Sequence, residues 1–335
     1  MFLRKIIGID FGTTRSRIVL PQKGIVLEQP TIIALEKPTK KIIAVGDKAE
    51  KMIGKAPNDI DIIRPVKNSV LSNYRASESF LRYLINESTG RFSFSKPIVV
   101  VSVPYLITSV EKRALEEAVM NAGASDVYLF PISYLAALGS NLEIHKPLGS
   151  MIVNIGAGTT ESAVLSFNGI VVSNSTKFGS MAVNDAIINY FKKVYGLIIG
   201  ENMSERVKIT VCSAIPVENQ KSIEVRGRDA SSGMPKSVVV QTNDLIDAIK
   251  PVLSQIIISV RSVLEKTPPE LSSDIVDNGI MVSGAGSSLE NLTTLMVKAL
   301  GIPVITSENP ELATAYGIQK IIEDFDSYSY KGKLT

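Results

Sequence analysis

Residues 6–14 read Ile-Ile-Gly-Ile-Asp-Phe-Gly-Thr-Thr, and residues 152–160 repeat the pattern as Ile-Val-Asn-Ile-Gly-Ala-Gly-Thr-Thr. In each copy an apolar run ends at an acid or its amide and turns through glycine and paired threonines. A second apolar strand follows at residues 17–20 and 163–165, so each copy predicts a β-hairpin with a glycine tip. A chain that builds this hairpin twice indicates two similar halves around one ligand.

The glycine tips predict a phosphate-binding cleft. Glycine lets backbone N–H groups face an anion without an intervening Cβ, and threonine hydroxyls add donors. A lone Gly-Thr-Thr tip is more often an ordinary turn, but a third glycine-rich turn, Gly-Ala-Gly at residues 284–286, lies between an apolar strand at 279–282 and a helical pattern beginning near Leu289. Three such strand ends around one cleft suit a ligand with phosphates, a sugar and a base.

The length and composition of the chain limit the classes of protein to which it can belong. A chain of 335 residues with 45% hydrophobic residues can bury two cores, since domains usually contain roughly 100–200 residues. The net charge of +3 comes without a basic block, so we expect no nucleic-acid partner. The single cysteine, Cys212, excludes an intramolecular disulfide and is expected in the core. The single histidine, His145, is expected in a loop and has no companions for a Cys/His metal site.

The chain carries no pattern of a membrane span or an exported protein. No segment approaches the roughly 18 apolar residues of a span, and the N-terminus reaches Asp10 before a signal-peptide core could form. We therefore expect a cytosolic protein.

Strands and helices alternate along the chain, which is typical of an α/β fold. Strands are expected at 98–103 and 127–129, with short strands between 24 and 44. The helix expected at 109–122 has Ser109 as its cap and an acid, Glu111, in its first turn. Other helical patterns cover residues 48–53, 76–88, 134–139, 182–195, 204–210, 245–265 and 310–322. The small residues of 134–139 suit a helix pressed against a neighbour.

These motifs, together with Ala-Val-Gly at 44–46, Ile-Arg-Pro at 63–65, Val-Arg-Gly-Arg-Asp at 225–229 and Lys-Thr-Pro-Pro-Glu-Leu at 266–271, resemble the MreB family of bacterial actins from about residue 4 to residue 322. The resemblance implies an actin-like α/β fold: two ribonuclease-H-like domains around a nucleotide cleft, each with a smaller subdomain. We expect domain I at 1–146 plus 311–335, with its small subdomain at about 32–75. Domain II is expected at 147–310, with its small subdomain at about 180–245.

The resemblance also implies a site for ATP or ADP with Mg²⁺. Asp10 would hold the ion through water. Glu205 and Lys208 match a Glu-x-x-Lys that flanks adenine and ribose, although spacing alone is equally compatible with an exposed ion pair. The nucleotide-binding residues expected from the family are Gly12, Thr13, Thr14, Gly156, Ala157, Gly158, Thr159, Glu205, Lys208, Gly284, Ala285 and Gly286.

The chain departs from the family where ATP is hydrolysed. Ile132 stands where the family has the glutamate that orients the attacking water, and an isoleucine can neither hold water nor accept a proton. Asn154 replaces an aspartate and weakens the magnesium site. Thr159, expected near the γ-phosphate, is retained. Arg15 and Arg17 replace uncharged residues; we expect both to be solvated at the strand edge, or one to reach a phosphate.

The resemblance therefore predicts an ATP-binding protein that assembles with itself into paired protofilaments for cell shape or motility, with weak or absent ATP hydrolysis. The alternative is an active ATPase in which a nearby residue such as Glu161 replaces the missing glutamate. A chaperone-type ATPase module is less favoured because no substrate-binding domain follows, and a sugar kinase would need a sugar-binding acid that the sequence does not offer.

A surface loop suggests contact with a membrane. Phe92 and Phe94 lie in a Ser/Lys-rich stretch at 91–96, which matches an apolar loop through which family members attach, and residues 1–5 (Met-Phe-Leu-Arg-Lys) offer a second segment. The two rings could instead pack under the loop. Basic neighbours would favour anionic lipid, which predicts a location at the inner face of the cell membrane.

Overall fold

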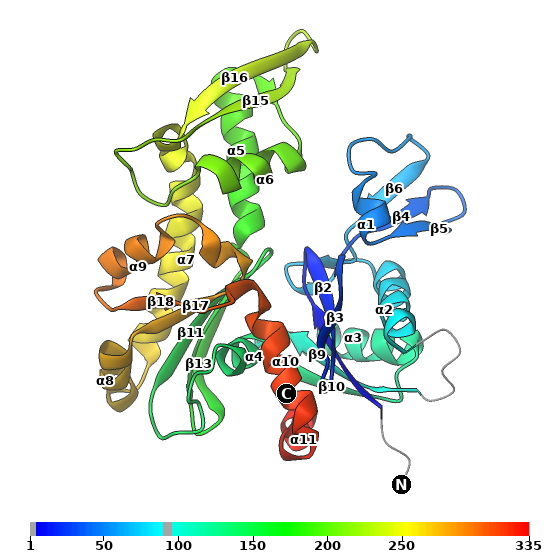
Figure 1. Ribbon diagram of the computed structural model, residues 1–335, viewed down its shortest axis with the longest axis vertical. Coiled ribbons are helices and arrows are strands. Elements are labelled where there is room, and N and C mark those ends of the chain that lie inside the picture. The colour runs from blue at the N-terminus through cyan, green and yellow to red at the C-terminus, as the bar shows by residue number, and fades with distance from the viewer. Residues whose placement is uncertain (1–4, 90–95, 335) are drawn as a thin grey trace.

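The structure, a computed structural model, describes residues 5–89 and 96–334. It is built around two five-stranded sheets that have the same strand order (Figure 1). The first sheet runs β10 (Asp126–Pro131), β9 (Ile98–Val103), β1 (Ile6–Phe11), β2 (Arg15–Leu20) and β3 (Gly24–Pro30). The second runs β18 (Val304–Thr306), β17 (Ile280–Ser283), β11 (Ser150–Ile155), β12 (Thr160–Ser166) and β13 (Gly169–Thr176).

Both predicted hairpins are present at the centres of these sheets. Gly8 of β1 lies opposite Val19 of β2, and Ile155 of β11 lies opposite Thr160 of β12, each in an antiparallel pair. On its other side each hairpin has two parallel strands, β9 and β10 in the first sheet and β17 and β18 in the second. The repeat in the sequence is therefore a repeat of one sheet topology.

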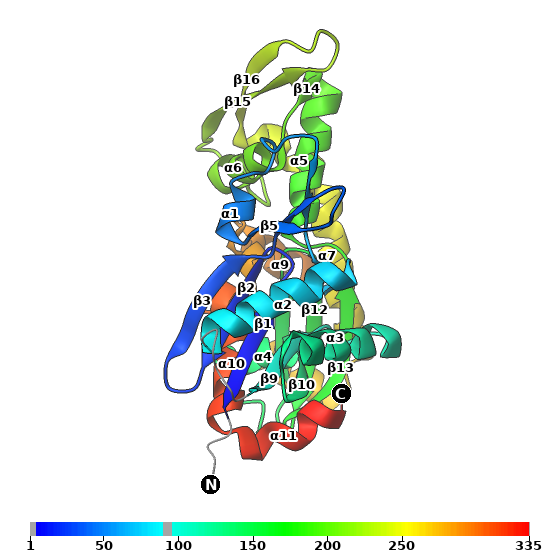
Figure 2. The ribbon, with the colours of Figure 1, turned by 90° about the vertical axis from the view of Figure 1, so that its right-hand side faces the viewer.

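Helices cover the faces of each sheet because the strands bury side chains on both sides. Alternate residues of β9 belong to different cores: Val99 and Val101 pack under α2 and α3, which lie across the first sheet in Figure 2, whereas Ile98 and Val100 face the other way. This two-residue period is the geometry of a strand buried on both faces. The helices are α1 (Asp47–Glu50), α2 (Tyr74–Thr89), α3 (Ser109–Ala122), α4 (Ile132–Gly139), α5 (Ser180–Tyr195), α6 (Glu201–Val211), α7 (Ile246–Lys266), α8 (Pro269–Asn278), α9 (Leu292–Leu300), α10 (Ala313–Glu323) and α11 (Phe325–Leu334), with 3-10 turns η1 (Thr242–Leu245), η2 (Ala285–Ser288) and η3 (Pro310–Leu312).

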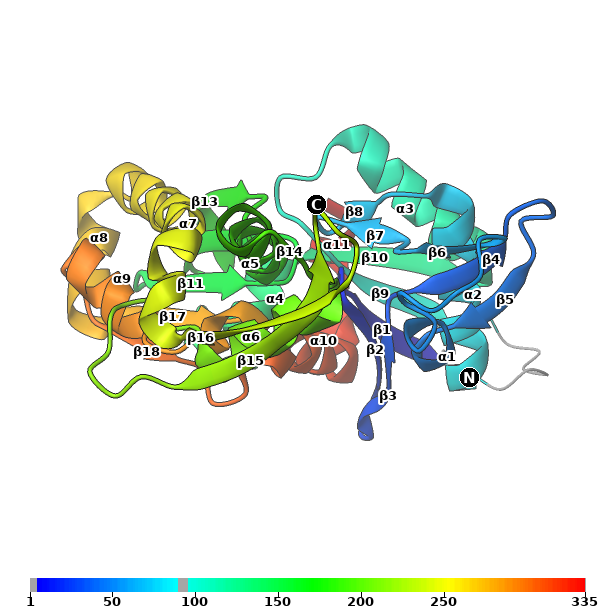
Figure 3. The same ribbon diagram turned by 90° about the horizontal axis from the view of Figure 1, so that it is seen from above.

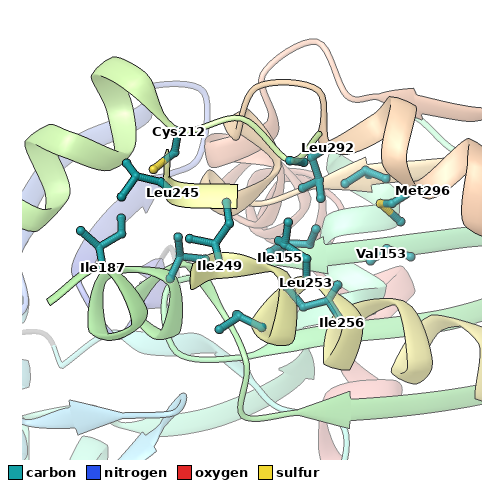
Figure 4. Packing of buried hydrophobic residues seen from close by; sticks show 14 of the residues in the cluster. Val153, Ile155, Ile187, Cys212, Leu245, Ile249, Leu253, Ile256, Leu292 and Met296 are labelled. Atoms are coloured by element: carbon teal, nitrogen blue, oxygen red, sulfur yellow. The ribbon is translucent and has the colours of Figure 1, made fainter. Parts of the chain in front are cut away.

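The second sheet packs against α7, and α5 packs against α7 in turn, so that side chains of both helices share one core with β11 (Figure 3). Met151, Val153 and Ile155 of β11 point into this core, and Figure 4 shows Cys212 among its apolar side chains. Cys212 is buried within this core, so its predicted role as a small core residue is confirmed. Burial also raises the pKa of its thiol to about 12. His145 is exposed in a turn, as predicted.

Helices α4 and α10 cross between the two sheets and join them (Figure 1). One apolar core contains side chains of both helices together with Val19 of the first sheet and Ile152 of the second. A Cβ on Gly139 would lie 1.8 Å from the carbonyl oxygen of Ala313, and a Cβ on Gly317 would lie 1.9 Å from that of Leu135. Only glycine allows this approach, so the predicted close packing of residues 134–139 is confirmed.

Three smaller sheets complete the described fold. In the first half, β5 (Ile42–Val45), β4 (Ile33–Glu36) and β6 (Ile60–Ile63) form one, and β7 (Val66–Lys67) pairs with β8 (Val70–Leu71). In the second half, β14 (Leu197–Ile198), β15 (Ser222–Asp229) and β16 (Pro235–Gln241) form the third. Within residues 5–89 and 96–334, no helix is both long and apolar enough to cross a bilayer.

Several helix ends differ from the prediction, and two of the differences have a clear local cause. The cap of α3 is Thr108, not Ser109: the Thr108 hydroxyl accepts from the Glu111 N–H, and the Glu111 carboxylate accepts from the Thr108 N–H in a capping box. The helix expected near Leu289 begins only at Leu292, because Asn291 has a left-handed backbone with φ of 61° and the glycine turn itself forms η2. The helix expected at 48–53 is the four-residue α1.

Candidate functional site

A cleft of about 510 Å³ opens between the two sheets where the hairpins turn. Its volume lies within the roughly 300–1,000 Å³ of small-molecule sites. The cleft brings together residues from all three predicted glycine turns, with Ile132 at the start of α4 and Glu205 on α6. The predicted site residues that line it are Asp10, Gly12, Thr13, Thr14, Ile132, Asn154, Gly156, Ala157, Thr159, Glu205, Gly284 and Ala285.

The first hairpin tip is held in shape by a residue of the chain beyond β3. Thr31 donates from its hydroxyl to the Gly12 carbonyl and from its N–H to the Thr14 carbonyl, both at 2.8 Å. A Cβ on Gly12 would lie 2.4 Å from the Arg15 carbonyl oxygen. Glycine is therefore required here by the tightness of the turn.

The second tip is bonded to the start of α5. The N–H groups of Ser180 and Met181 donate to the carbonyls of Gly156 and Ala157, each at 2.9 Å. A Cβ on Gly179 would lie 2.5 Å from the Ala157 carbonyl oxygen, so this glycine lets the helix approach. The tip and the helix start form one rigid edge of the cleft.

The third turn packs directly on the end of β11. Gly284 has φ of 83°, and a Cβ there would lie 2.3 Å from the Ile155 carbonyl oxygen. The two alanines of the glycine motifs, Ala157 and Ala285, have no positive φ. Neither alanine is therefore strained, and both fit the turn geometry.

A turn between β7 and β8 touches both hairpin tips. Asn68 and Ser69 have φ of 50° and 61°. The Ser69 N–H donates to the Thr13 hydroxyl at 3.1 Å, and the hydroxyls of Ser69 and Thr159 lie 2.9 Å apart. A Cβ on Gly158 would lie 2.8 Å from the Thr13 hydroxyl oxygen. The two tips therefore meet here, and Gly158 serves this contact rather than lining the cleft.

An ion pair also spans the mouth of the cleft. Arg64, just after β6, lies 3.0 Å from Glu201 at the start of α6, and both side chains line the cleft. The carboxylate is about half exposed, so the pair contributes little to stability. Its position means that the segment after β6 and the start of α6 touch across the opening.

A smaller apolar pocket of about 90 Å³ opens from the cleft. It shares Glu205 and Ala285 with the cleft and adds Lys208 and Gly286, two predicted residues that do not line the cleft itself. Its apolar walls include Ile155, Leu253, Ile256 and Leu292, which Figure 4 shows close together. The flat face of a base would suit these walls.

Glu205 and Lys208 form the ion pair expected from their spacing. The Lys208 ammonium lies 2.7 Å from the Glu205 carboxylate, and Asn184 donates to the same carboxylate at 2.6 Å. The lysine is largely buried, with 12% of its side chain exposed. The pair borders both pockets, so the ion-pair interpretation and the nucleotide interpretation are compatible.

Asp10 and Asn154 occupy equivalent places in the two sheets. The hydroxyl of Ser102, on the neighbouring parallel strand, donates to Asp10 Oδ1 at 3.1 Å, and that of Ser283 donates to Asn154 Oδ1 at 3.0 Å. Burial raises the pKa of the Asp10 carboxyl, and the nearby Arg17 guanidinium opposes the shift. The acid of the first sheet thus faces the neutral amide of the second.

The expectation that Arg17 is solvated at the strand edge is wrong. Arg17 is buried, with 7% exposure, and it contacts Asp10 at 3.4 Å and Glu28 at 2.7 Å. The strand register puts these side chains side by side, since Arg17 lies opposite Asp10 on one side and Glu28 on the other. Arg15 is exposed, as expected.

The residues predicted to hold Mg²⁺ fit that ion poorly. Magnesium prefers carboxylate and water oxygens in octahedral geometry, but one oxygen of Asp10 contacts Arg17 and the other accepts from Ser102. Asn154 carries no charge. In the part of the chain that the structure describes, no group of three or more His, Cys, Asp or Glu side chains is placed to hold a metal.

Ile132 and Glu161 differ in whether they border the cleft. Ile132 lines the cleft. Glu161 lies opposite Asn154 across the β11–β12 pair and is buried, with 1% exposure, outside the cleft lining. Burial raises the pKa of its carboxyl to about 7, although backbone groups of Tyr105 and Ser133 oppose the shift. Phe92 and Phe94, predicted at a membrane, lie outside the described residues.

A model of the MreB/Mbl protein family matches residues 4–330 of this sequence. The chain belongs to the MreB/Mbl family. It is 39% identical over 326 residues to the cell shape-determining protein Mbl of Bacillus subtilis (strain 168), covering 97% of this chain and 98% of that protein. It is 38% identical over 327 residues to the cell shape-determining protein MreB of Escherichia coli (strain K12), covering 96% of this chain and 94% of that protein.

Solved structures of an MreB protein have the same fold. MreB5 of Spiroplasma citri bound to ADP superposes with a TM-score of 0.92 at 29% identity, over 98% of this chain and 99% of that one. The same protein bound to AMPPNP superposes with a TM-score of 0.92 at 28% identity, over 99% of this chain and 100% of that one. The predicted MreB resemblance and actin-like fold are therefore confirmed.

Several residues of the cleft in this MreB/Mbl chain were not predicted. Ser69 reaches it from the turn between β7 and β8, and Arg64 and Glu201 meet across 137 positions of sequence. Ser102 and Ser283 do not line the cleft, but they bond to Asp10 and Asn154 from neighbouring strands. Arg17 could have been found, because a hairpin that turns at residues 12–14 places it opposite Asp10. The other residues could be placed near the cleft only once the order of the strands and the packing of the two halves were known.

Proposed function

We propose that this chain is a nucleotide-binding cytoskeletal protein that polymerises with itself in the cytoplasm and hydrolyses ATP slowly or not at all. The observation that carries the proposal is the meeting of three glycine turns around one cleft with Ile132 at its floor. The names of the relatives, which are cell shape-determining proteins, support a role in cell shape.

The cleft is suited to ATP or ADP. The glycine turns offer backbone groups to phosphates without side-chain obstruction, and the adjoining apolar pocket between Ile155 and Leu292 suits a base. The MreB5 structures with ADP and AMPPNP support the same ligand class. We propose the twelve residues predicted from the family as its nucleotide-binding set, with Gly158 acting through the contact between the tips.

We also propose the predicted domain division, with domain I at 1–146 plus 311–335 and domain II at 147–310. The two large sheets support it, since their strands lie at 6–131 and 150–306, and α10 contacts β1 and β2 of the first sheet. The small sheets lie in the proposed subdomains at about 32–75 and 180–245.

Slow hydrolysis follows from two side chains. Ile132 lines the cleft without any group that could orient water, and Asn154 supplies an amide where a carboxylate would strengthen a cation site. Loss of a proton-accepting group commonly costs about 10²- to 10⁴-fold in rate. Nucleotide binding does not need either group, so it should persist.

The test compares binding with turnover. Wild-type protein should bind ATP while its phosphate release stays near background, and Ile132→Glu combined with Asn154→Asp should raise phosphate release at least about 10-fold. Glu161→Gln is the matched control and should leave the rate within a few-fold. Wild-type turnover above that of the double variant would reject slow hydrolysis, and absence of ATP binding would reject the proposal altogether.

The alternative is an active ATPase that uses Glu161. The raised pKa of this carboxyl suits a general base. Its burial, and its absence from the lining of the cleft, speak against contact with an attacking water. Loss of a measurable wild-type rate in Glu161→Gln would favour this alternative.

We propose that filaments attach to anionic membrane through Phe92 and Phe94, at the inner face of the cell membrane. The two phenylalanine rings of one subunit form only a weak anchor, so attachment should need the avidity of a polymer that presents many subunits. Co-sedimentation with anionic liposomes tests this, and unchanged binding of polymer carrying both Phe92→Ser and Phe94→Ser would reject the loop as anchor.

A further inference from the structure

Three charged side chains form a row across three adjacent strands, and two of them, Asp10 and Arg17, line the cleft. Asp10 lies on β1, Arg17 lies opposite it on β2, and Glu28 lies opposite Arg17 on β3. Directly opposed residues in antiparallel strands point to the same face of a sheet. The register therefore fixes Arg17 between two carboxylates, and the cation cannot move far from this place.

The Arg17 guanidinium is presented to the cleft rather than only packed beneath it. Arg17 and Asp10 both line the cleft together with Gly12 and Gly156 of the two tips, although only 9% of the Arg17 side chain is exposed. A guanidinium has five N–H donors, and the described contacts to Glu28 and Asp10 use two of them. Donors remain for an anion in the cleft.

Arg17 and a divalent cation would serve the same two partners. Each would neutralise Asp10, and each would neutralise phosphate oxygens at the hairpin tips. Arg17 already contacts Asp10 Oδ2, and across the cleft Asn154 adds no negative charge that would draw a metal ion. Arg17 on β2 thus supplies part of the positive charge that a phosphate bound in the cleft needs.

We propose that Arg17 contacts the phosphates of the bound nucleotide and takes over part of the role of a divalent cation, so that nucleotide binding depends only weakly on magnesium. This inference rests on the proposed nucleotide-binding function. A charge-assisted hydrogen bond from arginine to phosphate is planar and strong, and its loss corresponds to about a 10- to 100-fold change in affinity.

The test is a two-by-two comparison of ATP affinity, with and without Arg17 and with Mg²⁺ or EDTA. Wild-type affinity should fall less than about 10-fold when EDTA replaces Mg²⁺. Arg17→Gln should weaken binding about 10- to 100-fold in EDTA and only a few-fold in Mg²⁺. Arg17→Lys should recover only part of the loss, because lysine keeps the charge but lacks the planar guanidinium. Arg82→Gln, which removes an exposed charge on α2 that pairs with Glu78, is the matched control for net charge.

Each outcome decides the inference. A wild-type loss above about 10-fold in EDTA overturns it, and so does an equal penalty of Arg17→Gln in both conditions. The wild-type comparison needs no variant, so it decides the matter even if Arg17→Gln does not fold. Absence of ATP binding under every condition would instead reject the nucleotide-binding function itself, which separates the two failures.

Discussion

Glu161 is the residue from which we expect the clearest dependence of stability on pH. Its carboxyl is buried, and its pKa is raised from 4.5 to about 7. Below pH 4.5 the group is neutral in both folded and unfolded chains. Between pH 4.5 and 7 the unfolded chain loses the proton while the folded chain keeps it, so the free energy of unfolding falls. Above pH 7 the full cost of roughly 3 kcal/mol is present.

Glu161→Gln removes this charge without changing the shape of the side chain. We expect the variant to be more stable than wild type at pH 8 and about equal at pH 4, as measured by thermal unfolding at both values. A gain of the same size at both pH values would contradict burial of an ionisable group as its cause.

The N-terminus of α3 provides a prediction at the scale of an element. Thr108 and Ser109 are both residues that commonly cap helices, but only Thr108 makes the capping box with Glu111. Thr108→Ala should therefore destabilise the protein by about 1 kcal/mol, while Ser109→Ala should have little effect. Urea denaturation measures both, and a larger effect at Ser109 would assign the cap to the residue that the sequence favoured.

The crossing of α4 and α10 provides a second prediction for elements. Gly317→Ala places a methyl group against the Leu135 carbonyl, where the backbones must separate, and overpacking of this kind costs about 1–3 kcal/mol or more. Gly200→Ala is the matched control, because a Cβ there meets nothing within 4 Å. Thermal unfolding of both variants should show a large loss only at Gly317.

Elements were predictable where one local signal decided them. The two hairpins followed from strand-length apolar runs that end at glycine, and the register of Gly8 with Val19 confirms the first. The cap of α3 was wrong by one residue because two capping residues stand next to each other. The burial of Arg17 was missed because period-two alternation does not say which face of a strand is covered, and Glu28 joins it only through the third strand of the sheet.

At the scale of the whole molecule, the two sheets are built alike but carry different chemistry at equivalent places. Asp10 and Arg17 in the first sheet correspond to Asn154 and Glu161 in the second. In each sheet the two residues lie opposite each other across the hairpin. The repeated topology forms the cleft, and we propose that Asn154 in place of a second acid, together with Ile132, leaves it able to bind its ligand but slow to cleave it. We therefore expect nucleotide to hold the two halves together without being consumed.

A polymer that does not hydrolyse its nucleotide lacks the change of state that loosens subunit contacts. Its filaments should form with ATP and persist after the excess nucleotide is removed. Variants that change only the cleft floor, such as Ile132→Glu with Asn154→Asp, should shorten that persistence because they restore turnover.

The most direct measurement follows pelleted protein and released phosphate in the same sample, with ATP, with ADP and without nucleotide. The account predicts that protein pellets with ATP while released phosphate stays far below one per pelleted subunit. Phosphate release that keeps pace with assembly, or protein that stays in the supernatant across salt and protein concentrations, would contradict it.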